Sequence, residues 1–150
     1  MIYVVGRGRV GSALTAALPE AIAVAGRGFS GISALTADDV VVLSVPDAAV
    51  AQCAAALAET PAVVLHCAGA VPLSALGQGS RGVLYPMVSF RSSVAWSQVP
   101  VFAESTDVRA AQAVPALGAK LAGIDPDRVT TRAALAALPV TRKYELLERQ

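Results

Sequence analysis

The sequence predicts an α/β fold: a doubly wound parallel sheet with helices on both faces. Three observations support this prediction. Apolar segments of strand length alternate with Ala- and Leu-rich segments, the run Val40–Val45 is apolar on both faces, and 55% of the 150 residues are hydrophobic against 15% charged. Strands of a parallel sheet are buried on both sides and therefore read as continuous apolar runs. Repeated strand–helix–strand units imply right-handed crossovers.

Strands and helices are expected to alternate along the chain. The expected strands are Ile2–Val5, Ile22–Ala25, Val40–Val45, Ala62–His66, Gly82–Tyr85 and Val99–Ala103. The expected helices are Val10–Leu18, Ala48–Glu59, Leu73–Leu76 and Val108–Leu121. The segment Phe29–Ala37 is short for a full helix, so an abbreviated turn is expected there. The predicted strand order is 3-2-1-4-5-6, with a ligand outside the carboxyl ends of the strands where the order reverses.

The most informative motif lies at the start of the chain, where Ile2–Val5 runs into Gly6-x-Gly8-x-x-Gly11 and then into a helix. The first glycine allows a tight turn, the second lets the backbone approach a pyrophosphate, and the third lets the helix pack closely on the strand. The helix N-terminus adds unpaired N–H groups and partial positive charge. This setting predicts a Rossmann dinucleotide-binding site. The loop residues expected at the cofactor are Gly6, Arg7, Gly8, Arg9, Val10 and Gly11.

The end of the second strand indicates which dinucleotide is expected. An NAD site usually carries Asp or Glu roughly 20 residues beyond the glycines, where it binds the ribose 2′-hydroxyl. Here the strand runs into Gly26-Arg27-Gly28 without an acid, and the planar guanidinium of Arg27 suits a phosphate. NADP is therefore the expected cofactor, with Ser30 as a second candidate ligand. The alternative is that Arg27 is a solvated loop cation.

Three other strand ends face the expected cofactor crevice. Val45, Pro46 and Asp47 are expected beneath the cofactor ribose, although Asp47 is equally placed to be the N-cap of the next helix. His66 is the single histidine and a candidate proton relay during hydride transfer, because imidazole titrates near neutral pH. The alternative is a buried histidine that binds backbone groups. Tyr85 could donate a proton to a carbonyl oxygen or serve only in packing.

Composition excludes several other classes of protein. The net charge of +1 offers no basic field for nucleic acid. The two cysteines form no C-x-x-C pair, and with one histidine they indicate no metal site and a reduced, cytoplasmic compartment. No apolar run approaches the length of a membrane span, and no signal peptide is expected.

Residues 1–124 are therefore expected to form the dinucleotide-binding domain, and residues 125–150 a short helical tail without a full second domain. The tail pattern predicts a turn at Asp125–Asp127 and helices at Thr131–Leu138 and Thr141–Arg149. Val140, Tyr144 and Leu147 share one face of the last segment. That face is expected to dock on its own domain, and the alternative is a contact in a homodimer.

Four motifs together resemble a family of Rossmann-like NADP-dependent oxidoreductases related to pyrroline-5-carboxylate reductase, the β-hydroxyacid dehydrogenases and ketopantoate reductases. They are Gly6-x-Gly8-x-x-Gly11, Leu43-Ser44-Val45-Pro46-Asp47, His66-Cys67-Ala68-Gly69 and Pro86-Met87-Val88-Ser89-Phe90. Such relatives usually carry His where this chain has Tyr85. They also continue into an all-helical second domain that closes over the nicotinamide.

The resemblance implies an NADP(H)-dependent oxidoreductase that reduces a C=O or C=N bond of a small metabolite. His66 and Tyr85 are then the candidate proton donors. A second copy or another partner would complete the active site. The alternative is a noncatalytic NADP-binding or regulatory module that keeps the cofactor fold without a substrate domain.

Overall fold

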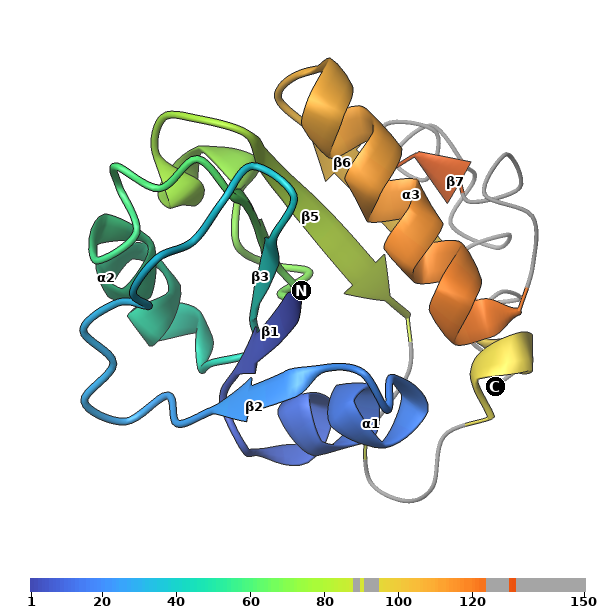
Figure 1. The fold of residues 1–150 in the computed structure, drawn as a ribbon. Helices are drawn as coiled ribbons and strands as arrows, with labels where there is room; N and C mark the ends of the chain where they lie inside the picture. The colour runs from blue at the N-terminus through green and yellow to red at the C-terminus, as the bar shows by residue number, and fades with distance from the viewer. Residues whose placement is uncertain (88–89, 91–94, 124–129, 132–150) are drawn as a thin grey trace.

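The computed structural model describes residues 1–87, 90, 95–123 and 130–131, which form one sheet in the order β2-β1-β3-β4-β5-β6-β7 (Figure 1). The strands are β1 Ile2–Val5, β2 Ile22–Val24, β3 Val40–Leu43, β4 Val63–His66, β5 Arg81–Pro86, β6 Val101–Ser105 and β7 Thr130–Thr131. The helices are α1 Arg9–Ala17, α2 Val50–Ala55 and α3 Val108–Ala122, with 3-10 turns at η1 Asp47–Ala49, η2 Leu73–Leu76 and η3 Trp96–Gln98. The predicted α/β class with a mostly parallel sheet is confirmed.

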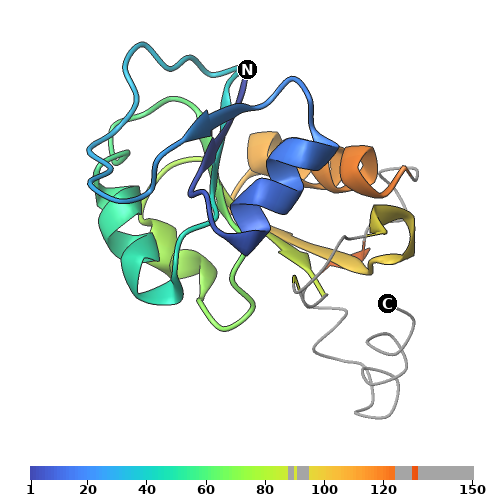
Figure 2. The same ribbon diagram turned by 90° about the horizontal axis from the view of Figure 1, so that it is seen from below.

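The sheet separates two apolar cores because successive strand residues point to opposite faces. Val4 and Val42 join the core that contains Leu14 of α1 and Val114 of α3. Val5, Val41 and Leu43 instead join the core that contains residues of α2. Figure 2 shows this arrangement, with α1 and α3 on one side of the sheet and α2 on the other. No helix among the described residues is long and apolar enough to cross a membrane.

The predicted strand order is wrong. The third strand, β3, pairs with β1 in parallel instead of lying outside β2. The physical reason lies in the connection from β2 to β3, which contains no helix and bends at Gly28 and Gly31, both with positive φ. Without a crossover helix to place a strand beyond β2, the chain returns to the free side of β1. The order therefore reverses at β1, between β2 and β3.

The last long strand also departs from the prediction, because β6 runs antiparallel to β5. The connection between them holds only the short turn η3 among its described residues, whereas a parallel pair needs a crossover of a dozen or more residues that is usually a helix. Met87 N–H donates to Pro100 O at 2.9 Å and closes the antiparallel ladder.

Two helix predictions also need correction. The segment predicted as one helix, Ala48–Glu59, is split into η1 and the shorter α2. Asp47 is not the N-cap, because Pro46 holds that position and no side chain caps the turn. In the tail, Thr131 lies in β7 and not in a helix. The remainder of the predicted helix, the turn at 125–127 and the segment 141–149 lie outside the described residues.

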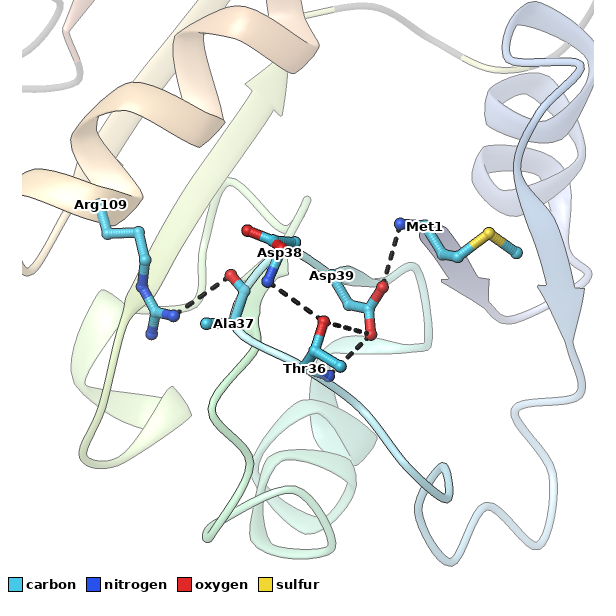
Figure 3. Close-up of polar contacts among 6 residues, drawn as sticks. All are labelled: Met1, Thr36, Ala37, Asp38, Asp39 and Arg109. Atoms are coloured by element: carbon cyan, nitrogen blue, oxygen red, sulfur yellow. Dashed lines mark hydrogen bonds and ion pairs between the residues drawn. The ribbon is translucent and has the colours of Figure 1, made fainter.

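Polar contacts at the amino edge of the sheet hold the entrance to β3 (Figure 3). The buried carboxylate of Asp39 accepts hydrogen bonds from the Thr36 amide at 2.8 Å and the Thr36 hydroxyl at 3.3 Å, and it pairs with the Met1 amino group at 3.0 Å. Arg109 of α3 reaches across to donate to Ala37 O at 3.2 Å. These contacts set where β3 begins, and β3 carries the residues of the candidate site at its other end.

The acid stability of the protein is expected to depend on Asp107, the N-cap of α3. Hydrogen bonds from the Ser80 hydroxyl and the Ala110 amide lower the pKa of this carboxyl. A carboxyl whose folded pKa is depressed stabilises the fold above its unfolded pKa, and that stabilisation is lost as the pH falls below about 4. Asp107→Asn should therefore narrow the difference between the melting temperatures at about pH 7 and about pH 3. Asp38→Asn, at an exposed position nearby, should leave the difference unchanged. An equal effect of both variants would contradict the assignment.

Candidate functional site

A cavity of about 660 Å³ lies where the carboxyl ends of β1, β2 and β3 meet the start of α1. This is the point where the strand order reverses, and open α/β sheets bind their ligands at such switch points. Its volume falls within the usual range for small-molecule and cofactor sites. The lining residues are Gly6, Arg7, Gly8, Ala25, Gly26, Arg27, Ser44, Val45, Pro46 and Ala49.

The three glycines of the loop meet different surroundings. Gly6 has a φ of +110°, a backbone conformation that favours glycine. A Cβ atom on Gly11 would lie 2.0 Å from Gly6 O, so only glycine lets α1 pack this closely on the loop. A Cβ atom on Gly8 would meet nothing within 4 Å. Gly8 therefore borders open space, on the side where a ligand would approach the backbone.

The first turn of α1 lies beside the cavity and carries no competing acid. Gly8 is the N-cap and makes no side-chain hydrogen bond to the helix, and the first turn contains no acidic residue. The first N–H groups of a helix have no partner within the helix, and their dipoles favour an anion. The arrangement suits a phosphate group placed over the glycine loop.

Arg7 and Arg27 both line the cavity, and both are exposed. Within the described part of the chain, no hydrogen bond or ion pair engages either guanidinium, and no carboxylate lines the cavity. Arg9 is also exposed but is not among the lining residues. The cavity therefore presents two cationic groups that a polyanionic ligand could neutralise.

The structure places some of the other predicted cofactor residues at the cavity and others away from it. Val45 and Pro46 line the cavity, and Val45 packs against Gly26 at the end of β2. Val10, Gly11 and Asp47 do not line it. Sequence reasoning missed four lining residues, namely Ala25, Gly26, Ser44 and Ala49. The available signal was position, because each lies within two residues of a strand end or in the short helical turn after β3.

His66 ends β4 and is completely buried. Its Nδ1 accepts a hydrogen bond from the Ala68 amide at 3.0 Å, and its Nε2 lies 3.3 Å from Pro72 O. An acceptor Nδ1 places the imidazole proton on Nε2, where it faces the Pro72 carbonyl. Both ring nitrogens thus contact the turn that follows β4, which matches the alternative of a histidine that binds backbone groups. His66 does not line the cavity.

Tyr85 lies close to the same turn. A Cβ atom on Gly69 would come within 2.7 Å of the Tyr85 ring and 3.0 Å of its hydroxyl oxygen, so the ring rests on the Gly69 backbone. The ring also packs against Phe102, with 6.5 Å between centroids. Tyr85 is half-buried and does not line the cavity. The structure therefore brings His66 and Tyr85 to one turn at the carboxyl edge of the sheet, outside the lining of the cavity.

Cys67, in the same turn, is a poor candidate nucleophile. Burial raises the pKa of its thiol to about 12, so the thiol is protonated at neutral pH. Among the described residues, no three His, Cys, Asp or Glu side chains gather where they could hold a metal ion.

Fold and site together define a Rossmann-like α/β domain with a glycine-rich loop at its switch point. No protein-family model and no curated protein matches the chain. Among solved structures, the chain is similar to protein BF3122 from Bacteroides fragilis, provisionally described as an NADP oxidoreductase, with a TM-score of 0.67 and 20% identity. That match covers 96% of this chain and 66% of the other. Protein TM1727 from Thermotoga maritima matches with a TM-score of 0.64 and 19% identity, over 83% of this chain and 55% of the other.

Proposed function

We propose that this chain is the cofactor domain of an NADP(H)-dependent oxidoreductase. The observation that carries the proposal is the cavity beside the glycine loop, whose lining holds no carboxylate and two arginines without a partner among the described residues. In this proposal the N-terminus of α1 binds the pyrophosphate, and Arg27 binds the 2′-phosphate. The fold shared with a provisionally described NADP oxidoreductase supports the same assignment.

The proposed reaction is reduction of a C=O or C=N bond of a small metabolite, for which NADPH supplies the hydride when it is bound. The substrate oxygen or nitrogen then needs a proton. We assign its donation to the Tyr85 hydroxyl, which lies at the carboxyl end of β5. His66 is assigned a positioning role, because its ring nitrogens contact the backbone of the turn on which Tyr85 rests.

The substrate half of the site is proposed to come from outside the described residues. The chain spans 66% and 55% of the lengths of the two similar structures. A second copy of the chain or another partner is the proposed source of the residues that cover the nicotinamide. A noncatalytic NADP-binding module is the second candidate function, and it is favoured by the absence of His66 and Tyr85 from the cavity lining.

The cofactor assignment predicts a clear difference between NADPH and NADH. NADPH at about 100 times its Kd should raise the free energy of unfolding by about 2.7 kcal/mol, and NADH at the same concentration should have much less effect. Arg27→Ala should weaken NADPH binding by about tenfold or more, because it removes a charge-assisted hydrogen bond, and should leave NADH unchanged. Thermal unfolding and fluorescence titration measure both effects.

Arg9→Ala is the matched control, since Arg9 is also an exposed arginine, at the start of α1, but does not line the cavity. It should retain the preference for NADPH. Equal stabilisation of the unmodified protein by NADH and NADPH would contradict the role of Arg27. Stabilisation by neither dinucleotide would contradict the cofactor assignment itself.

Enzyme and binding module are distinguished by NADPH oxidation in the presence of keto acids, imines and aldehydes. For an active protein, Tyr85→Phe should lower turnover by about 10²-fold or more, the usual contribution of a general acid, with little change in NADPH affinity. His66→Ala should lower both turnover and thermal stability, because it removes the contacts that hold the turn. Unchanged turnover in both variants would overturn the proton-donor assignment.

A further inference from the structure

The peptide between Val5 and Gly6, where β1 enters the glycine loop, is held from both sides. The Val5 carbonyl oxygen accepts two hydrogen bonds from Ser44, one from the amide and one from the hydroxyl, each 2.8 Å long. On the other side, the Gly6 amide donates to Val24 O at 2.8 Å. The two strands next to β1 thus set the orientation of the first peptide of the loop.

The Ser44 side chain also occupies the space that two loop glycines leave. A Cβ atom on Gly6 would lie 3.0 Å from the Ser44 Oγ, and one on Gly11 would lie 2.8 Å from it. Gly6, Gly11 and Ser44 therefore form one closely packed unit at the end of β1. Ser44 lines the cavity as well, so this unit borders the space proposed for the dinucleotide.

The next peptide joins Gly6 to Arg7. The Gly6 carbonyl oxygen points toward Gly11, because a Cβ atom there would lie only 2.0 Å from it. In a trans peptide the N–H group points opposite to the carbonyl, so the Arg7 amide is turned away from Gly11. The peptide that Ser44 holds directly precedes this one, and the two are joined at the Cα atom of Gly6.

We infer that Ser44 is a positioning residue of the dinucleotide site, whose hydroxyl holds the glycine loop in its binding conformation. The inference rests on the proposed function for the identity of the ligand. The amide of Ser44 keeps its own hydrogen bond to Val5 O in any substitution of the side chain. Loss of the hydroxyl therefore leaves the strand pairing in place and removes one restraint on the loop.

Ser44→Ala and Ser44→Cys test this role together. Alanine removes the hydroxyl, and cysteine restores volume but offers only a weak hydrogen-bond donor. Both variants should weaken NADPH binding by about fivefold, the effect of one hydrogen bond. Amide hydrogen exchange at Gly6 and Arg7, measured by NMR without ligand, should become faster. Ser33→Ala, at an exposed position outside the cavity lining, should change neither quantity.

The outcomes separate this inference from the proposed function. Ser44→Ala with unchanged NADPH affinity and unchanged exchange at Gly6 overturns the inference. Full affinity in Ser44→Cys with loss in Ser44→Ala also overturns it, because volume and not the hydroxyl would then matter. Absence of NADPH binding in the unmodified protein overturns the proposed function. In that case the exchange rates still decide whether the hydroxyl holds the loop.

Discussion

Replacing Gly11 by alanine should abolish NADPH binding and lower the free energy of unfolding by about 3 kcal/mol, the upper part of the range for overpacking a core. The new Cβ atom would lie 2.0 Å from Gly6 O and 2.8 Å from the Ser44 Oγ. The closer of these atoms belongs to the backbone, so the clash is relieved only if α1 moves away from the loop. Urea unfolding and NADPH titration measure the two effects.

Gly8→Ala is the matched control, because the same methyl group would meet nothing within 4 Å. The φ of −78° at Gly8 is also allowed for alanine. Stability should change by less than about 1 kcal/mol, whereas NADPH binding should still be lost if the dinucleotide occupies the open space. A Gly8→Ala protein with full NADPH affinity would show that the ligand does not approach Gly8. A Gly11→Ala protein of normal stability would contradict the packing argument.

The glycine loop could be predicted because its requirements are local. The turn at Gly6 and the close approach at Gly11 follow from the sequence between one strand and the helix directly after it, and the structure has both. The order of the strands could not be predicted in the same way. It depends on which side of β1 the chain reaches after β2. No sequence pattern in the segment between β2 and β3 predicts with which strand β3 will pair.

The residues that line the cavity could also be predicted only in part from the sequence. Arg7 and Arg27 line it, whereas Arg9, two positions after Arg7 at the start of α1, does not. Sequence position shows that an arginine is near the site but does not show the direction of a long side chain. Ser44 was missed as a site residue for a related reason. Its importance comes from contacts with Val5, Gly6 and Gly11, which are distant in sequence and meet only because β3 pairs with β1.

The position of His66 at a strand end could be predicted from the sequence, but its chemical role could not. Its place at the end of β4 follows from the apolar run before it, and the structure has it there. Its partners are the Ala68 amide and the Pro72 carbonyl, two backbone groups of the turn. No property of those residue types indicates that their backbone atoms would enclose an imidazole, so the sequence alone left open both a proton relay and a buried structural histidine.

Arg81→Met is expected to have the largest effect on stability in the protein, a loss of about 3–5 kcal/mol. Arg81 begins β5 and is completely buried. Its guanidinium donates hydrogen bonds to four backbone carbonyl oxygens at 3.1–3.4 Å, those of Leu57, Ala62, Leu76 and Ser80. Burial lowers the pKa of this guanidinium, yet arginine stays charged at neutral pH. Methionine fills much of the volume but removes the guanidinium donors, and only Leu57 O and Ser80 O keep a hydrogen bond from another backbone amide in the loops and turns, from Thr60 and Val64.

The location of Arg81 makes the prediction specific, because it lies at the amino edge of the parallel strands and the cavity lies at the carboxyl edge. Urea unfolding of Arg81→Met should show the loss, while NADPH affinity well below the melting temperature should stay unchanged. Arg9→Met, at an exposed arginine, should alter the free energy of unfolding by less than about 0.5 kcal/mol. A similar small effect at Arg81 would contradict the view that its four carbonyl contacts join the segment after α2, η2 and the starts of β4 and β5 into one unit. A loss of NADPH affinity out of proportion to the loss of stability would instead link the two edges of the sheet.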